Sequence, residues 1–353
     1  MNKFDFDDVL IIPGLKTDIS SRYKNVTLPR TLPLFTAPMD TVINLNNLDL
    51  FLDNGINVTL PRTVKYEQFF EQVQNNNTAK YLNVFISFGF EDLDELYENN
   101  FKDLYNNAHI LIDVANGHMQ KIVDYAREIK RLRPDIKIMV GNIGNPETYG
   151  WYVENECVDY IRVGIGNGGG CLTTKQSGIG YPMASLINET YAVKLKYLND
   201  NNKTWKLPYI VADGGMKNHS DIIKSLGLGA DYVMVGSIFN KALESAGDNY
   251  LYGLKVSQKN AEYLYGKNLP IKKYFRGMST KQAQKAMGKT NFKTSEGVIR
   301  YRKVEYRLSG WIENFEHYLR NAMSYNGANS LDKFIGNIKI CEITKSAYDR
   351  FNK

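Results

Sequence analysis

The chain has 353 residues, of which 43% are hydrophobic and 23% charged, as in ordinary globular proteins. No apolar run is long enough to cross a bilayer, and the acidic N-terminus lacks the apolar core of a signal peptide, so we expect a cytoplasmic protein that does not contact a membrane. The 44 basic and 38 acidic residues leave a net charge of +6, but they are scattered, which argues against a nucleic-acid partner.

Eight short apolar runs recur along the chain, and each is typical of a buried parallel strand. Most of them begin about 25 residues apart, which leaves room for one helix between neighbours; the runs are 34–37, 57–60, 82–87, 109–114, 136–140, 160–163, 209–212 and 232–235. One intervening segment, 119–133, carries apolar residues at helical spacing. This alternation predicts an α/β fold, a (β/α)8 TIM barrel formed by residues 1–353 as a single domain; the alternative is a doubly wound open sheet.

Two segments interrupt the regular spacing, and each follows the C-terminal end of a predicted strand. Residues 164–182 separate the sixth and seventh runs and begin with five glycines in seven residues. A long excursion follows the eighth run and includes a flap and C-terminal segment, 271–310. Because barrel enzymes carry their chemistry on the loops at this end of the strands, we expect residues 164–182 to be a catalytic loop.

Cys171 ends the glycine-rich run and is the candidate nucleophile, because a thiolate is strongly nucleophilic once its pKa is lowered. The carbonyls of such a loop are also suited to a monovalent cation. The alternative for the loop is a flexible surface connection. Cys157 and Cys341 are interpreted as small buried hydrophobes, since the three cysteines have the spacing of neither a zinc site nor a disulfide framework.

Polar and glycine residues follow four of the predicted strands. Loops after the seventh and eighth strands of a barrel commonly bind phosphate through backbone N–H groups, and they hold Asp213-Gly214-Gly215 and Gly236-Ser237 here. Asp213 is suited to accept hydrogen bonds from ribose hydroxyls, although a helix N-cap is its alternative role. Asp113, at the end of the fourth predicted strand, and Asn116 and Asn142, after the fourth and fifth, are placed to face a second ligand.

These motifs, taken in order, resemble the IMP dehydrogenase and GMP reductase family over nearly the whole chain. The segments that carry the resemblance are Phe6-Asp7-Asp8-Val9-Leu10 with Pro13, Ala37-Pro38-Met39-Asp40-Thr41-Val42, the loop ending at Cys171, Asp213-Gly214-Gly215, Gly277-Met278-Ser279, and Leu319-Arg320 through Tyr325-Asn326-Gly327-Ala328.

Within the family the chain is more similar to the reductases, which convert GMP to IMP and ammonia with NADPH. Segments 113–117 and 178–182 look like reductase motifs, and only 17 residues separate Met278 from Glu296, so the flap is short. The Arg-Tyr pair of the dehydrogenase flap does not precede Glu296, and no regulatory domain interrupts the barrel. The alternative is an IMP dehydrogenase without that regulatory domain, which would oxidise IMP with NAD.

The resemblance implies a covalent adduct of Cys171 with purine C2, Thr173 and Glu296 as acids that expel ammonia, and hydride transfer from NADPH to C2. It also implies a homotetramer and a potassium ion on the carbonyls of Gly166, Gly168 and Cys171. The implied substrate-binding residues are Met39, Asp213, Gly214, Gly215, Gly236, Ser237, Gly277, Met278 and Ser279, and the implied cofactor-binding residues are Asp113, Asn116, Gly117 and Asn142.

Four departures from the family pattern lie in the substrate region. Gly169 stands where the family usually has a phosphate-binding serine, and Asn167 where it has a proline. Phe275 stands where the dehydrogenases have a phosphate-binding tyrosine, and Pro61-Arg62-Thr63 replaces a His-Lys-His run of the reductases. These departures leave open a deoxy or otherwise modified purine nucleotide as substrate, or a nucleotide-binding regulator that has lost catalysis.

Overall fold

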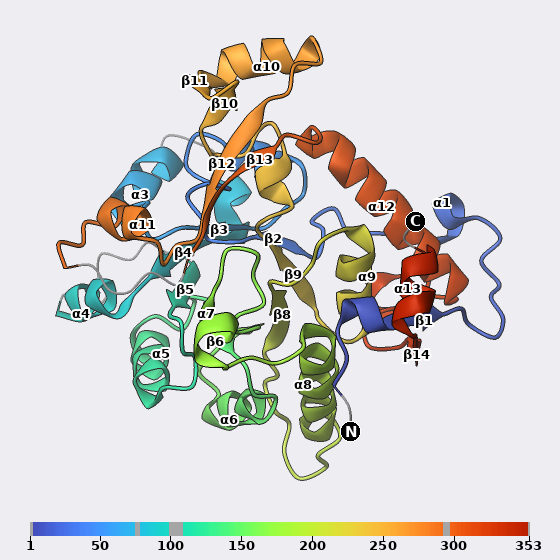
Figure 1. Ribbon diagram of the computed structural model, residues 1–353. Helices are drawn as coiled ribbons and strands as arrows, with labels where there is room; N and C mark the ends of the chain where they lie inside the picture. The colour runs from blue at the N-terminus through green and yellow to red at the C-terminus, as the bar shows by residue number, and fades with distance from the viewer. Residues whose placement is uncertain (1–2, 75–77, 99–108, 292–296, 352–353) are drawn as a thin grey trace.

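Eight parallel strands form one sheet in the computed structural model, which describes residues 3–74, 78–98, 109–291 and 297–351 (Figure 1). The strand order is β2-β9-β8-β7-β6-β5-β4-β3, and a parallel bridge between Phe35 and Asn57 joins the two ends. The sheet therefore closes into the predicted (β/α)8 barrel, and the doubly wound alternative is wrong. The strands are β2 (Leu34–Thr36), β3 (Val58–Leu60), β4 (Val84–Phe88), β5 (His109–Asp113), β6 (Ile138–Ile143), β7 (Tyr160–Val163), β8 (Tyr209–Asp213) and β9 (Tyr232–Val235).

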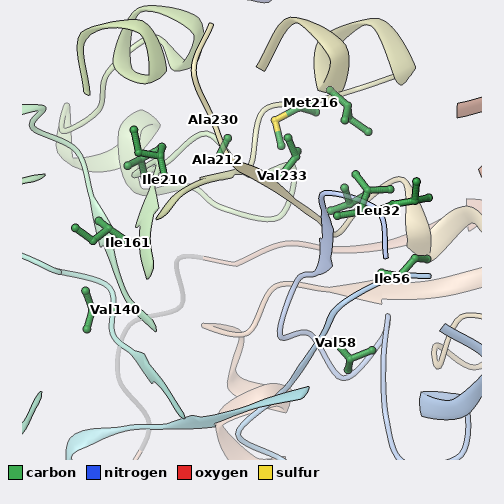
Figure 2. Close-up of a cluster of buried hydrophobic side chains, with 14 of the residues drawn as sticks. Leu32, Ile56, Val58, Val140, Ile161, Ile210, Ala212, Met216, Ala230 and Val233 are labelled. Carbon is green, nitrogen blue, oxygen red and sulfur yellow. The ribbon is translucent and has the colours of Figure 1, made fainter. Parts of the chain in front are cut away.

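Side chains of successive residues on these strands alternate between two apolar layers. One layer fills the barrel interior and consists of Phe35, Ala37, Phe85, Leu111, Met139, Tyr160, Val211 and Met234. The other lies between the strands and the surrounding helices, and Figure 2 shows part of it, with Val140, Ile161 and Ile210 on neighbouring strands. Each of these three side chains is completely buried, which stabilises the fold by about 2 kcal/mol apiece.

Helices surround the barrel because each has one apolar face. In α5, for example, Ile122, Val123, Ala126 and Ile129 are buried, and the observed helix, Gln120–Leu132, confirms the prediction of helix over 119–133. The helices that alternate with the strands are α2 (Leu48–Asp53), α3 (Tyr66–Gln74), α4 (Phe90–Glu98), α5, α6 (Glu147–Asn155), α8 (Met183–Leu198), α9 (His219–Gly227) and α12 (Leu308–Tyr325).

Each of the eight predicted apolar runs contains one barrel strand, with small differences at the ends. β4 begins at Val84, two residues later than predicted, because a 3-10 helix, Thr78–Asn83, occupies the start of that run. β6 begins at Ile138 and continues to Ile143, since its last residues keep their pairing with β7 across an irregularity in register. The apolar pattern thus located the strands, and local backbone structure set their ends.

The excursion after β9 builds a second, antiparallel sheet of four strands that projects from the barrel at the top of Figure 1. β12 is its longest-paired strand: it pairs with β13 over five residues, which brings Phe275 opposite Arg300. The elements of this excursion are β10 (Asn249–Leu251), β11 (Leu254–Val256), α10 (Gln258–Gly266), β12 (Lys272–Arg276), α11 (Lys281–Ala286) and β13 (Ile299–Lys303).

The two ends of the described chain meet in a two-stranded antiparallel sheet, β1 (Val9–Ile12) with β14 (Lys339–Glu342), next to α13 (Lys345–Phe351) (Figure 1). The short helix α1 (Arg22–Asn25) packs against α12 instead. Cys341 lies on β14 and is exposed, so the expectation that it is buried was wrong, whereas Cys157 is buried as expected. The period of two on this edge strand turns its side chain to solvent. Among the described residues, no helix has both the length and the apolar character needed to span a bilayer.

Candidate active site

A pocket of about 400 Å³ opens at the C-terminal ends of the barrel strands, where the sequence predicted the site. It lies beneath the sheet of the excursion, and residues from most of the strand ends, the glycine-rich loop and the flap line it together. The lining residues are Ala37, Pro38, Met39, Arg62, Asp113, Val114, Ala115, Asn142, Arg162, Gly168, Gly169, Gly170, Cys171, Asp213, Gly214, Gly215, Met216, Met234, Val235, Gly236, Ser237, Ile238, Phe275, Gly277, Met278, Ser279 and Met287.

The glycine-rich loop carries Cys171 to the pocket on a tight turn. The Cys171 N–H donates to the Gly168 carbonyl at 2.9 Å, and a short helix, α7 (Thr173–Ser177), begins two residues later. This turn exposes the thiol and leaves its Sγ 3.1 Å from Oγ1 of Thr173. A nucleophilic sulfur that lines the pocket therefore lies beside a hydroxyl that can exchange a proton with it.

The flap is joined to the Cys171 loop by backbone contacts. Cys171 forms an antiparallel bridge with Gly297, and the Val298 N–H donates to the Gly170 carbonyl at 3.2 Å. The Gly277 N–H in turn donates to the Val298 carbonyl at 3.0 Å, so this donor is already engaged within the protein. Glu296, the acid predicted in the flap, lies outside the described residues.

Asp213, at the end of β8, belongs to a charged chain that crosses the pocket floor. Arg162 Nη2 donates to Asp213 Oδ2 at 2.8 Å, and its Nη1 donates to Asp113 Oδ1 at 2.7 Å. Asn142 Nδ2 also donates to Asp213 Oδ2, at 2.8 Å. Burial disfavours the charge of Arg162, but the two aspartates outweigh burial and raise its pKa. The hydrogen bonds orient the Asp213 carboxylate and leave Oδ1 for a ligand.

Arg162 is a site residue that the sequence analysis missed. It lies in β7, two residues after the inward-facing Tyr160, and its side chain is 6% exposed. A signal was present: an inward position of a buried strand rarely holds a charge unless the charge is paired. Asp113 and Asp213, at the ends of two other strands, were the available partners.

The residues predicted to bind the cofactor divide into two groups. Asp113 and Asn142 line the pocket, but Asn116 and Gly117 do not. Gly117 has a structural contact instead: its N–H donates to the Asn142 carbonyl at 2.8 Å, and a Cβ there would lie 2.6 Å from the same oxygen. Asn116 Oδ1 accepts a hydrogen bond from the backbone N–H of the next-but-one residue. Their role in the loop is to hold its turn against β6.

Arg62 adds a positive charge to the lining of the pocket. Its Nη2 donates to Asp92 Oδ2 at 3.2 Å, and a Cβ at Gly89 would lie 2.1 Å from that nitrogen, so a glycine at 89 leaves room for the guanidinium. Arg62 Nε is buried and, in the described part of the chain, has no hydrogen-bond partner. Arg62 therefore keeps a fixed charge, but unlike lysine it cannot serve as a proton donor.

Gly214, Gly215, Gly236 and Ser237 line one part of the pocket, which we call its glycine-lined end. Gly214 and Gly215 both have left-handed φ angles, of 89° and 93°, which glycine adopts without strain. A Cβ on Gly214 would lie 2.9 Å from the Gly168 nitrogen, so this glycine permits the contact between the β8 end and the Cys171 loop. Gly236 and Ser237 follow β9 on the other side. Met39, Met278 and Ser279, which the resemblance implies as substrate-binding residues, also line the pocket.

The carbonyls of Gly166, Gly168 and Cys171 belong to the loop between β7 and α7. Gly166 has a φ of 80°, and a Cβ on it would collide with Oγ1 of Thr174, which itself donates to the Ile179 carbonyl at 2.8 Å. The loop is thus folded back on the start of α7. Carbonyl oxygens are the donor type that a monovalent cation prefers, so the residues fit the predicted potassium ion chemically.

An exposed thiol, a hydroxyl beside it, an oriented carboxylate and a glycine-lined end share one barrel mouth. This arrangement defines a barrel with a ligand pocket suited to covalent chemistry on a phosphorylated compound. A family model described as "IMP dehydrogenase / GMP reductase domain" matches residues 3–350. The chain therefore belongs to the IMP dehydrogenase and GMP reductase family, as the motifs indicated.

The curated relatives match over most of their length. A GMP reductase of Staphylococcus carnosus is 30% identical over 345 residues, which cover 94% of both chains. A GMP reductase of Caenorhabditis elegans is 27% identical and covers 99% of this chain and 94% of its own. A GMP reductase of Ligilactobacillus salivarius is 27% identical, again over 94% of both chains.

Proposed function

We propose that the protein is a GMP reductase that converts GMP, NADPH and two protons to IMP, NADP⁺ and ammonium. The observation that carries the proposal is the exposed Cys171 thiol, 3.1 Å from the Thr173 hydroxyl and joined by a bridge to the flap at Gly297. The names of the relatives supply the reaction, and the short flap and the segments at 113–117 and 178–182 favour the reductase over the dehydrogenase.

The pocket would hold GMP between its glycine-lined end and the sulfur of Cys171. Asp213 Oδ1 would accept hydrogen bonds from the ribose hydroxyls, because Arg162 and Asn142 already hold Oδ2. Backbone N–H groups of Gly215 and Ser237 would donate to the 5′-phosphate. Met39, from the loop after β2, would border the purine, which places purine C2 toward the thiol.

In the proposed reaction, the Cys171 thiolate forms a bond to purine C2, and the bond between C2 and the amino nitrogen breaks. Thr173 and Glu296 would deliver the protons with which the nitrogen leaves as ammonia. A hydride then bonds to C2, the carbon–sulfur bond breaks, and its electron pair returns to sulfur. The products are IMP and the regenerated thiolate, so atoms and charges balance.

NADPH would supply the hydride when it is bound. Asp113, Val114, Ala115 and Asn142 line the same pocket as Cys171, so a nicotinamide ring fits beside the purine. Gly166, Gly168 and Cys171 carbonyls would hold potassium and keep the loop turn in shape. The choice of NADPH over NADH, the potassium ion, the single domain over 1–353 and the homotetramer all stay predictions.

Substitution of Cys171 tests the reaction directly. Purified protein mixed with GMP and NADPH is expected to lose NADPH absorbance and to release IMP and ammonia in equal amounts. Cys171→Ala should lower kcat by at least about a thousandfold because it removes the sulfur that forms the covalent adduct at C2. Cys341→Ala, which changes an exposed cysteine on β14, is the matched control and should leave kcat unchanged.

Product analysis distinguishes this proposal from its alternatives. NADH formation from IMP and NAD, without NADPH loss in the presence of GMP, would assign the chain to the dehydrogenases. Faster turnover of dGMP than of GMP would replace the ribonucleotide by a deoxynucleotide as substrate. Binding of GMP without turnover of any purine nucleotide would support the regulator and contradict the proposed function.

A further inference from the structure

The guanidinium of Arg302, on β13, lies against the glycine-lined end of the pocket. Its Nη1 donates to the Ser237 carbonyl at 3.3 Å, and its central carbon lies 4.0 Å from the centre of the Phe275 ring. A Cβ built on Gly169 would lie 3.4 Å from its Nη2. Gly169, Ser237 and Phe275 all line the pocket, and Arg302 lies against these three lining residues.

Among the described residues, no carboxylate forms an ion pair with the guanidinium of Arg302. The side chain is half-buried, and burial together with the neighbouring Arg300 lowers its pKa. Glu305, the carboxylate whose charge acts on it, is paired with Lys241 at 3.0 Å instead. A half-buried cation without an anionic partner is costly, so an anion bound at this end of the pocket would be favoured.

Residues with unpaired backbone donors line the same pocket. Within the described ranges, the backbone N–H groups of Gly169, Gly215 and Ser237 have no acceptor from the protein. Because position 169 is a glycine, no side chain separates the guanidinium from these groups; a Cβ there would also lie 3.8 Å from Cβ of Ser237. A cation next to unpaired, pocket-lining N–H groups forms the kind of site that binds phosphate.

We propose that Arg302 binds the 5′-phosphate of the purine nucleoside monophosphate and is the residue through which this chain distinguishes a nucleotide from its nucleoside. The planar fork of arginine matches two phosphate oxygens at once, and the Phe275 ring holds the fork in place by stacking. The identity of the nucleotide rests on the proposed function, whereas the phosphate contact requires no turnover.

Calorimetric titration of Arg302→Gln tests the contact. Loss of a charge-assisted pair with phosphate should raise the Kd for GMP about 30-fold, whereas the Kd for guanosine should stay the same. Arg302→Lys, which keeps the charge but not the fork, should fall between wild type and Arg302→Gln. Lys303→Gln removes an exposed charge from the same strand and is expected to leave both constants unchanged.

The nucleoside and the cofactor provide the decisive comparisons. Equal losses for GMP and guanosine in Arg302→Gln and Arg302→Lys would reduce Arg302 to a structural role and overturn the proposal, as would unchanged GMP affinity. A weakened Kd for NADPH alone would assign the arginine to the cofactor and also overturn it. If Arg302→Gln does not fold, the GMP-to-guanosine ratio of Arg302→Lys decides. A phosphate-selective loss in a protein without turnover would uphold Arg302 while the proposed reaction fails.

Discussion

At the scale of single residues, the site depends on charges that orient one another. Arg162 is held between Asp113 and Asp213 at 2.7 and 2.8 Å, and Asn142 shares the Asp213 oxygen. Removal of Arg162 would leave two partly buried carboxylates without their cation, which costs more than the pairs themselves contribute. These hydrogen bonds fix the Asp213 carboxylate before any ligand binds.

Arg162→Lys tests that orienting role. A lysine has a single ammonium group, which cannot donate to both aspartates at once. Asp213 should therefore become mobile, and the KM for GMP should rise about tenfold, equivalent to about 1.4 kcal/mol. The change in kcat should be smaller because no reacting atom is touched. Arg131→Lys, in an exposed pair with Glu128 on α5, is the control and should change neither constant. A fall in kcat alone would contradict the orienting role.

Sequence reasoning could find residues whose neighbours in the chain mark them. Cys171 and Asp213 stand in glycine-rich motifs at strand ends, and the structure places both in the pocket. Arg162 and Arg302 belong to no recognisable motif, and the hydrogen-bond partners that give them a role lie about 50 or more residues away, where only folding brings them near. The departure at Gly169 was visible in the sequence, but the guanidinium beside it was not.

At the scale of elements, the junction between the flap and the Cys171 loop is the contact on which the site depends most. The backbones of the two segments pass so closely that a Cβ on Gly277 would lie 2.6 Å from the Gly170 carbonyl oxygen and 3.2 Å from Cα of Gly297. The apolar periodicity predicted where the loop and flap begin. It could not predict their contact, because neither segment has a repeating pattern and the contact is made by backbone.

Gly277→Ala should therefore separate the two segments. The added methyl group would push the flap from the Cys171 loop, so kcat with GMP is expected to fall at least about tenfold while the melting temperature changes little, since the barrel core is untouched. Gly310→Ala is the matched control: it lies in α12, a Cβ added there would meet nothing within 4 Å, and alanine should slightly stabilise the helix. Unchanged turnover in Gly277→Ala would show that the junction is not needed.

At the scale of the whole molecule, the residues at the two ends of the barrel have different roles, one in the pocket and the other in stability. The C-terminal ends of the strands carry the pocket, and the N-terminal ends carry ion pairs that hold strands to helices. Eight evenly spaced apolar runs were enough to predict the closed barrel, because strand count and spacing follow from the connections that a parallel sheet requires. The second sheet, from β10 to β13, was not predicted, since its short strands are half-exposed and lack that spacing.

Asp159, just before β7, tests the stabilising end of the barrel through pH. It accepts from Lys130 and Lys206, each at 2.7 Å, and from the Ile138 N–H at 2.8 Å. Burial opposes its ionisation, but the hydrogen bonds from the two lysines outweigh burial and lower its pKa below the ordinary value of 3.8.

A carboxylate with a lowered pKa in the folded state stabilises the fold above its unfolded pKa, and the contribution disappears as pH falls through the folded pKa. Asp159→Asn should therefore reduce the free energy of unfolding by about 2 kcal/mol at pH 7, and the difference from wild type should shrink below about pH 4. Chemical denaturation at several pH values measures both. Glu147→Gln, in an exposed pair, should change stability by less than about 0.5 kcal/mol at any pH. A difference for Asp159→Asn that stays constant from pH 7 to pH 3 would mean that packing, not ionisation, gives the residue its effect.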